Sequence, residues 1–378
     1  MKRIKLIVNC STLQDGGALQ VGRTIINTMS DDPRLVCMYV LSKPLYNSMP
    51  SFELSNINYI VLNKSPARSI KMRKKMKRVE FDFLPEIVYS VGFPSYVKFR
   101  TIEVGRYTNP WEINEGYLPW DVLPNLKTKV LYFFGMLYRQ HWSKNADYIE
   151  TQTQSAKRGI VKRVGIQSSN IFVLPNVVNE VFYKTKKNRI TSCHASKIFC
   201  LAAAYPHKNL TIIPIVAAIL KNKYNFKGKF YITIKKDGGI YKDIYRIAIE
   251  LGVDNLIHNL GPISLDQCVK YYNKCKIVFQ PSLLEVFSAT YLESMIMGRP
   301  LVVPNLPFAK NVCGDSALYY HHDSADEAAK CIYKLISDSS LYTKIAKLSE
   351  RRADLYPKPV DKQKEIVEIL LKLSNKHN

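Results

Sequence analysis

The sequence predicts an α/β protein made of two doubly wound domains. Its 378 residues are too many for one ordinary domain, so two domains are expected. Strand-like apolar segments alternate with helical patterns along most of the chain, which is typical of parallel sheets with right-handed crossovers. The alternation stops once, in the polar and basic stretch "NEVFYKTKKNRITSCHASK", and then starts again.

That interruption sets the predicted domain boundaries. We expect a Rossmann-like N-terminal domain over residues 1–180, a linker over 181–195 and a Rossmann-like C-terminal domain over 196–356. The helical pattern "KQKEIVEILLKLSN" lies in the remaining segment, residues 357–378. We expect this helix to pack back on the N-terminal domain.

The individual elements follow from short apolar runs and from helical spacing. Residues 127–145 show helical apolar spacing, at Val130, Phe133, Phe134, Leu137 and Tyr138. Strands of the first half are predicted at "RIKLIVNC", "RLVCMYVL", "INYIVL" and "EIVYSVG". Strands of the second half are predicted at "IFCLAAAY", "KFYITIK", "NLIHNLG", "CKIVFQPS" and "PLVVPN".

Composition indicates a cytoplasmic protein with packed cores. The hydrophobic content is 47%, and no apolar run approaches the roughly 20 residues that span a bilayer. None of the eight cysteines stands in a Cys-x-x-Cys pair or at zinc-ligand spacing, which favours reduced, buried thiols. There is no convincing acidic metal-binding motif either, so neither a metal nor a cofactor is expected.

The net charge of +24 predicts an anionic partner. Charge is densest between Lys64 and Arg78, where eight of fifteen residues are Lys or Arg and none is acidic. This segment has three interpretations: a solvated basic helix, a nucleic-acid patch, or a patch for an anionic membrane surface. We favour the membrane surface and expect no nucleic-acid partner.

Two glutamates, Glu285 and Glu293, are separated by seven residues around the predicted start of a helix at Ser288. The helix is expected to stop at Gly298, two residues before Pro300. A helix N-terminus favours phosphate. Glu293 would lie about 7 Å further along the helix, at 1.5 Å per residue, within reach of a ribose. Glu285 would lie on the other side of the phosphates, where a sugar would be. This spacing fits a bound nucleotide-sugar.

The segment "PSLLEVFSATYLESMIMGRPLVVPNLPFAKNVCGDSALYY" resembles the nucleotide-binding part of retaining glycosyltransferases with the GT-B fold, in the large group that assembles bacterial polysaccharides. The resemblance covers about residues 198–320. It implies two Rossmann-like domains facing across a cleft. It also implies that Glu293 holds the ribose and that Glu285 contacts the donor sugar. The backbone of Val286, Phe287 and Ser288 would face the diphosphate.

The sequence departs from the family pattern at three places. Val286 and Ser288 stand where glycine is frequent, and the bulk of Val286 is expected to narrow donor choice. The family carries an Arg and a Lys on the diphosphate; here the Lys is Lys208, but the Arg position holds Ala203. Lys235, Lys236 or Arg299 are candidates to replace the missing arginine.

Two glycine sites complete the donor side that the resemblance implies. Gly16 and Gly17 lie in a loop after the first strand, where the family approaches donor and acceptor; by itself, a glycine pair fits a plain turn equally well. Gly261 lies where the family backbone borders the base.

The acceptor side is expected in the loop "YTNPWEINEGY". Its candidate contacts are Asn109, Trp111 and Glu112, and an ordinary packed loop is an equal alternative.

The resemblance implies a retaining, metal-independent glycosyltransferase with Glu285 and Lys208 as its catalytic residues. The acceptor would be a saccharide, carried on a polyprenyl diphosphate at the inner face of the cytoplasmic membrane, in the synthesis of O-antigen, capsule or exopolysaccharide. One alternative is a GT-B enzyme with a soluble acceptor or a nucleotide-sugar epimerase. Another is a basic nucleic-acid-binding protein.

Overall fold

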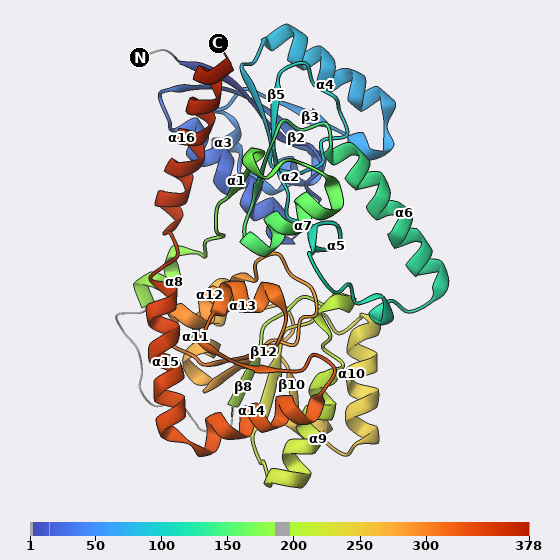
Figure 1. Cartoon of the computed structure of the whole chain (residues 1–378), viewed down its shortest axis with the longest axis vertical. Coiled ribbons are helices and arrows are strands. Elements are labelled where there is room, and N and C mark those ends of the chain that lie inside the picture. Colours follow the sequence, from blue (N-terminus) through green and yellow to red (C-terminus); the bar gives the residue numbers. More distant parts are fainter. Residues whose placement is uncertain (1–2, 15, 186–196, 378) are drawn as a thin grey trace. The chain divides into compact units, whose positions relative to one another are not determined.

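The computed structural model describes residues 3–14, 16–185 and 197–377 (Figure 1). Contacts divide the chain into two compact units. The first unit comprises Met1–Glu115, Val130–Leu174 and Val360–Asn378, and the second comprises Gly116–Lys129 and Pro175–Pro359.

The first unit is built on a seven-stranded parallel sheet in the order β3-β2-β1-β4-β5-β6-β7. In the register of this sheet, Ile4 of β1 lies opposite Leu35 of β2, and Leu6 lies opposite Ile87 of β4. The strand order reverses at β1, as in doubly wound folds. The strands are β1 (Ile4–Cys10), β2 (Leu35–Ser42), β3 (Tyr59–Leu62), β4 (Ile87–Ser90), β5 (Ile102–Arg106), β6 (Tyr148–Thr151) and β7 (Ile171–Val173).

Helices cover both faces of this sheet because successive side chains of its buried strands point to opposite sides. Leu6 and Val8 of β1 join the core formed with α1 and α16, whereas Ile7 joins the core formed with α4. The helices that contribute residues to this unit are α1 (Gly16–Ser30), α2 (Lys43–Ser48), α3 (Ser51–Leu54), α4 (Ile70–Phe83), α5 (Pro110–Ile113), α6 (Leu126–Ser143), α7 (Gln154–Val164) and α16 (Pro359–His377).

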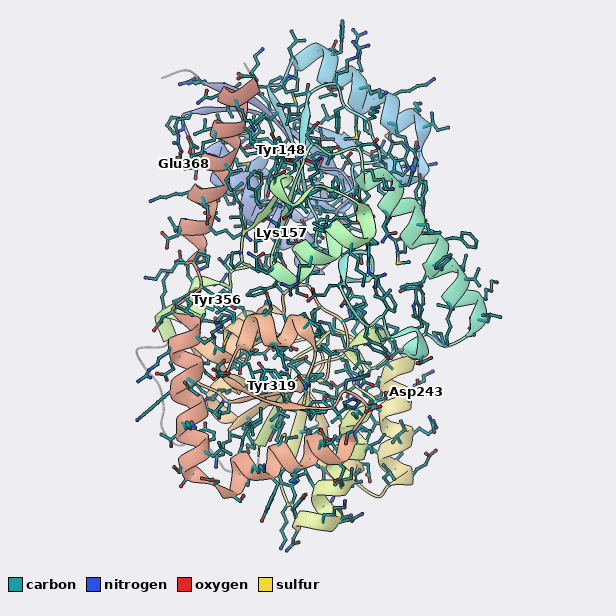
Figure 2. The ribbon with its side chains drawn as sticks, viewed as in Figure 1. Tyr148, Lys157, Asp243, Tyr319, Tyr356 and Glu368 are labelled. Carbon is teal, nitrogen blue, oxygen red and sulfur yellow. The ribbon has the colours of Figure 1, made fainter. Side chains whose placement is uncertain are left out.

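Helix α16 returns the chain to the first unit. Its apolar residues Ile366, Val367, Leu370 and Leu373 are buried in the same core as α1. Ion pairs join it to the rest of the unit: Lys362 lies 3.7 Å from Glu150 of β6, and burial lowers the pKa of this lysine to about 8. Glu368, labelled in Figure 2, accepts a hydrogen bond from Arg34.

The second unit contains a six-stranded parallel sheet in the order β10-β9-β8-β11-β12-β13. The strands are β8 (Lys197–Cys200), β9 (Lys229–Ile232), β10 (Ile257–Asn259), β11 (Ile277–Phe279), β12 (Leu301–Pro304) and β13 (Ala317–Tyr320). The helices are α8 (Glu180–Thr185), α9 (Ile212–Tyr224), α10 (Gly239–Glu250), α11 (Leu265–Lys274), α12 (Ala289–Ile296), α13 (Pro307–Cys313), α14 (Ala325–Ser337) and α15 (Ser339–Ala353). Two parallel doubly wound sheets confirm the predicted fold class.

Again, neighbouring side chains of one strand serve two cores. Ile198 and Cys200 of β8 pack with α9, α10 and α14, while Phe199 packs with α8, α11 and α12. Helix α8 begins at Glu180, so residues 181–185 of the predicted linker instead belong to a helix whose Phe182 is fully buried against this unit. Residues 186–195 of the predicted linker lie outside the described residues.

The seven cysteines that the structure describes carry free thiols, and five of them are buried. The eighth, Cys193, lies outside the described residues.

Candidate nucleotide-sugar site

The candidate site lies at the carboxyl ends of three neighbouring strands of the second unit. Strand β8 lies between β9 and β11, and all three are parallel, so the loops that follow them leave the same edge of the sheet. Lys208 lies in the segment after β8, and Glu285 lies in the loop after β11. The topology therefore brings together two residues that the sequence separates by 77 positions.

Lys208 and Glu285 form an ion pair in the structure. The two loops are also tied through the backbone, because the N–H of Leu283 donates to the carbonyl of His207 at 2.8 Å. The side chains of Lys208 and Glu285 are 18% and 10% exposed, so a ligand can still reach the pair from one side. An incoming diphosphate would attract the ammonium, and the carboxylate would then be available to sugar hydroxyls.

His207, beside this pair, stays neutral at physiological pH. Burial lowers the pKa of its imidazole to about 4, and the nearby Glu285 acts in the opposite direction. Its ring stacks on that of Tyr205, with the centroids 5.7 Å apart. Lys208 is therefore the cation that this loop offers to a phosphate.

Glu293 lies on α12, as predicted, and it has a partner that the sequence did not reveal. The hydroxyl of Tyr272, on α11, donates to Oε2 of Glu293 at 2.8 Å. Burial raises the pKa of the Glu293 carboxyl to about 7, and the tyrosine hydrogen bond opposes that rise. Tyr272 is fully buried, so its hydroxyl holds the carboxylate in one orientation. Two hydroxyls of a ribose are suitable further donors to such a group.

Helix α12 begins where the sequence predicts, with Ser288 as its N-cap. The side chain of Ser288 makes no capping hydrogen bond, and the N–H of Tyr291 donates to the carbonyl of Ser288 at 3.1 Å. The helix stops at the expected glycine: Gly298 has a φ of 61°, and its N–H donates to the carbonyl of Met295. Binding of a diphosphate at the start of the eight-residue helix α12 remains a prediction.

Val286, Phe287 and Ser288 are buried, with exposed fractions of 5%, 7% and 6%. The ring of Phe287 makes an edge-to-face contact with Tyr356, labelled in Figure 2, at a centroid distance of 5.5 Å. Contact of the backbone of this loop with a diphosphate remains a prediction. The effect of Val286 on donor choice remains a prediction.

Gly261 follows β10 at the same edge of the sheet. It has a φ of 72°, which favours glycine, and its N–H donates to Oδ1 of Asn259 at 3.1 Å. The same amide side chain bonds the backbone N–H and carbonyl of Ile234. Asn259 therefore fixes the loops after β9 and β10 together, a role that only the fold reveals.

The missing family arginine is not replaced by Arg299. This residue is 6% exposed, and its guanidinium donates to the carbonyl of Asn273 and to the hydroxyl of Tyr342. Lys235 and Lys236 are exposed and follow β9, next to β8. Of the three candidates, these two lysines lie at the correct edge of the sheet.

In the first unit, Gly16 and Gly17 open helix α1. A Cβ at Gly17 would meet no atom within 4 Å, so the backbone there is open to a ligand. The segment before it is fixed by the hydroxyl of Thr12, which donates to the carbonyl of Gly92 at 2.7 Å. Contact of these glycines with the donor remains a prediction.

The predicted acceptor residues are used by the fold. Asn109 is the N-cap of α5 and accepts from the N–H of Trp111 at 3.2 Å. Trp111 packs edge-to-face on Tyr132. The carboxylate of Glu112 is fully buried and forms an ion pair with Arg139, and burial raises its pKa to about 7. The packed-loop alternative describes these contacts, and a role toward an acceptor stays a prediction.

The basic segment divides into an outward cationic face and an inward apolar face. Met76 is buried, and Met72 is partly buried, in the core below α4. The apolar content of this segment therefore supports the fold. Its exposed cations are Lys64, Arg68, Lys71, Lys74, Lys75, Lys77 and Arg78.

Within the described residues, no group of three or more His, Cys, Asp or Glu side chains is arranged to hold a metal ion.

Comparison with known proteins shows that the chain is similar to glycosyltransferases. Residues 186–352 match the family model described as "Glycosyl transferases group 1". The chain is 23% identical over 181 residues to the O-antigen chain mannosyltransferase RfbU of Salmonella typhimurium, which covers 48% of each protein. It is 24% identical over 279 residues to the serotype-specific mannosyltransferase WbdA of Escherichia coli, covering 69% of this chain and 34% of that protein.

The chain thus spans about half of the first relative and about a third of the second. Among solved structures, it is similar to Anabaena HepE in complex with UDP, with a TM-score of 0.70 and 16% identity over 98% of this chain and 100% of that one. At this identity the likeness concerns the fold, and it agrees with the GT-B fold expected from the sequence.

Proposed function

We propose that the protein is a retaining glycosyltransferase, a proposal supported by the match of residues 186–352 to the group 1 glycosyltransferase model. It moves a sugar from a nucleotide-sugar to a saccharide acceptor. The observation that carries this proposal is the ion pair between Lys208, after β8, and Glu285, in the loop that leads into α12, with Glu293 inside that helix. These groups match the three parts of a nucleotide-sugar: diphosphate, sugar and ribose.

In the proposed reaction, negative charge grows on the diphosphate as the bond to the anomeric carbon breaks. Lys208 and the start of α12 stabilise that charge, which is the usual largest contribution to this kind of catalysis. Glu285 positions the donor sugar through its hydroxyls once Lys208 has moved to the phosphate. A phosphate oxygen of the leaving group accepts the acceptor proton on the same face, so no general base and no metal ion are required.

The acceptor is proposed to be a growing surface polysaccharide on a polyprenyl diphosphate at the inner face of the membrane. Two relatives named as mannosyltransferases, one of them of O-antigen chains, support this direction and put mannose first among the sugars to test. In the described residues no helix is both long and apolar enough to cross a bilayer. The exposed cations between Lys64 and Arg78 supply an electrostatic contact with anionic lipid.

A thermal-shift screen against UDP-, GDP- and dTDP-sugars tests the donor. A ligand at a hundred times its Kd stabilises the protein by about 2.7 kcal/mol, so the correct donor should raise Tm clearly above the others. If no nucleotide-sugar raises Tm, the proposal fails. Transfer assays with the donor so identified, using lipid-linked and soluble acceptors in parallel, then separate this proposal from a soluble-acceptor enzyme or an epimerase.

A further inference from the structure

Helix α6 carries its apolar residues on the outside of the molecule. Residues Val130, Leu131, Phe133, Phe134 and Leu137, here called the α6 apolar face, are 44%, 63%, 45%, 63% and 43% exposed. The positions that α6 buries are Met136, Gln140 and Ser143, two of them polar. A surface helix normally does the opposite, with the apolar stripe inward. A row of exposed apolar side chains on one helix indicates a surface that another phase or molecule covers.

Helix α6 is fastened to the start of α4 through Arg73. The guanidinium of Arg73 donates to the hydroxyl of Tyr138 at 2.6 Å and lies 4.7 Å from the ring centre of Trp142. It also donates to the carbonyls of Pro66 and Ala67, and Tyr138 donates to Ala67 as well. These contacts hold α6 against the start of α4 on the first unit, where Figure 1 shows the two helices as neighbours.

The cations of α4 project outward because its apolar side chains are used inside. Met72, Met76, Val79 and Phe83 pack against strands of the sheet. Ile70 and Phe81 are 70% and 64% exposed among those cations. The exposed cations of α4 itself are Lys71, Lys74, Lys75, Lys77 and Arg78. One of them, Arg78, pairs with Asp82.

We propose that α4 and α6 together form a bilayer-binding surface, in which the α6 apolar face enters the boundary between headgroups and acyl chains. The α4 cations then lie against anionic headgroups. Apolar insertion combined with cation–headgroup attraction is how helices bind in the plane of an anionic membrane. This inference deepens the proposed function, since it names the residues by which the enzyme reaches a lipid-linked acceptor.

Charge favours a membrane over a second copy of the chain as the occupant. A symmetric dimer through this surface would bring two sets of the same cations together, which costs free energy through like-charge repulsion. An anionic bilayer supplies the opposite charge over a broad plane. It also accepts scattered aromatic and aliphatic side chains without requiring a shaped pocket.

Sedimentation of the full-length protein with lipid vesicles tests the proposal. Vesicles of phosphatidylethanolamine with phosphatidylglycerol provide anionic lipid, and phosphatidylcholine vesicles provide a neutral surface. The double substitution Phe134→Ser, Leu137→Ser should weaken binding to anionic vesicles on the order of tenfold or more, since each side chain loses its apolar transfer energy. Lys74→Glu, Lys77→Glu should weaken it too, and salt should weaken wild-type binding.

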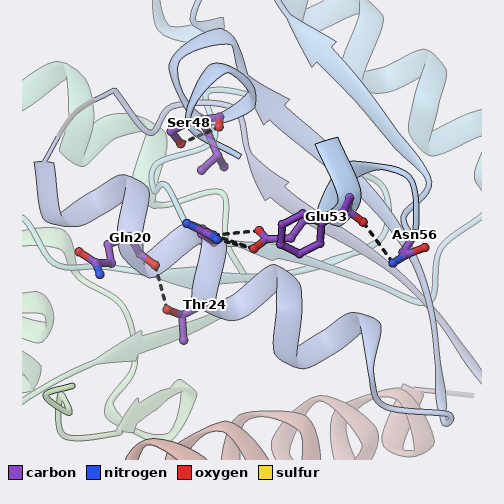
Figure 3. Close-up of polar contacts among 8 residues, drawn as sticks. Gln20, Thr24, Ser48, Glu53 and Asn56 are labelled. Carbon is purple, nitrogen blue, oxygen red and sulfur yellow. Dashed lines mark hydrogen bonds and ion pairs between the residues drawn. The ribbon is translucent and has the colours of Figure 1, made fainter. Parts of the chain in front are cut away.

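A matched control is Phe52→Ser. Phe52 is 68% exposed and lies on α3, which an ion pair between Arg23 and Glu53 fastens to α1 (Figure 3). This substitution removes an equally exposed aromatic side chain away from α6 and should leave vesicle binding unchanged. Far-UV circular dichroism and the Tm shift with the donor show that each variant is folded.

Equal vesicle binding by wild type and the α6 double variant overturns the proposal. So does a wild-type dimer in the absence of lipid that the α6 double variant converts to a monomer. Failure of the proposed enzyme activity gives a different pattern, in which α6-dependent vesicle binding persists but no nucleotide-sugar binds. If the α6 double variant transfers sugar to a soluble saccharide but no longer binds vesicles, the result supports the proposed enzyme activity and the proposed bilayer-binding surface.

Discussion

The two units use their predicted site residues in different ways. In the second unit, Lys208 and Glu285 pair with each other at the edge of the sheet and remain 18% and 10% exposed. In the first unit, Glu112 is fully buried against Arg139, and Asn109 caps a helix. Two residues chosen by the spacing of a motif thus stay partly exposed at the edge of the sheet, whereas those chosen by residue type within a loop stabilise the fold.

The largest effect is expected from the cation of the second unit. Lys208→Ala should lower kcat by about 10²- to 10³-fold, the usual cost of removing one group that stabilises developing negative charge. Lys270→Ala removes an exposed lysine from α11 of the same unit and is the matched control. Both variants are assayed at saturating donor. A Lys208→Ala enzyme with wild-type turnover would remove Lys208 from the mechanism.

Glu112 should contribute to the stability of the fold and not to the affinity for the donor. Glu112→Ala leaves Arg139 without its carboxylate, and we expect a loss of roughly 2–3 kcal/mol, below the ~3–5 for a fully buried pair because Arg139 is 29% exposed. Urea unfolding measures this loss, and calorimetric titration should show unchanged donor affinity. A stable variant that no longer uses the acceptor would instead assign Glu112 to the acceptor site.

Glu293 should make stability depend on pH. Burial raises its folded pKa from 4.5 to about 7, so its contribution is fully present below pH 4.5 and is lost as pH rises through about 7. Glu293→Gln lacks this titration. Its stability relative to wild type should therefore increase by up to about 1.4 kcal/mol per pH unit over that window and level off above it. Urea unfolding between pH 5 and 8 measures the difference, and a difference that does not vary with pH would contradict the burial.

The smallest effect is expected at Asn109. Asn109→Ala removes the cap of α5 and should cost about 1 kcal/mol of stability, while Asn109→Ser retains a capping hydroxyl and most of that stability. Thermal unfolding of the two variants compares them. If both variants instead raised the KM for the acceptor without changing Tm, Asn109 would be a contact of the acceptor.

Local patterns predicted much of this molecule. The alternation of strands and helices predicted both sheets, and Ser288 and Gly298 predicted the start and stop of α12, because caps depend on residues near in the chain. Contacts between distant segments were not predictable in this way. Tyr272 reaches Glu293 from another helix, and nothing in the sequence around Tyr272 marks it as a hydrogen-bond donor to that carboxylate.

Helix α6 shows the same limit for a surface. Its apolar spacing predicted a helix correctly, but periodicity identifies a stripe without saying what covers it. The stripe lies outside, whereas Met72 and Met76 of the basic segment lie inside. The direction of a helical face is set by tertiary packing, which only the fold reveals.

The central claim, that the second unit holds a nucleotide-sugar with Glu293 on the ribose, is tested most directly by isothermal titration of the donor found in the thermal-shift screen. Glu293→Ala should bind that donor about 10- to 100-fold more weakly than wild type, the usual loss for hydrogen bonds to a charged group. Unchanged affinity in a folded Glu293→Ala protein would contradict the account.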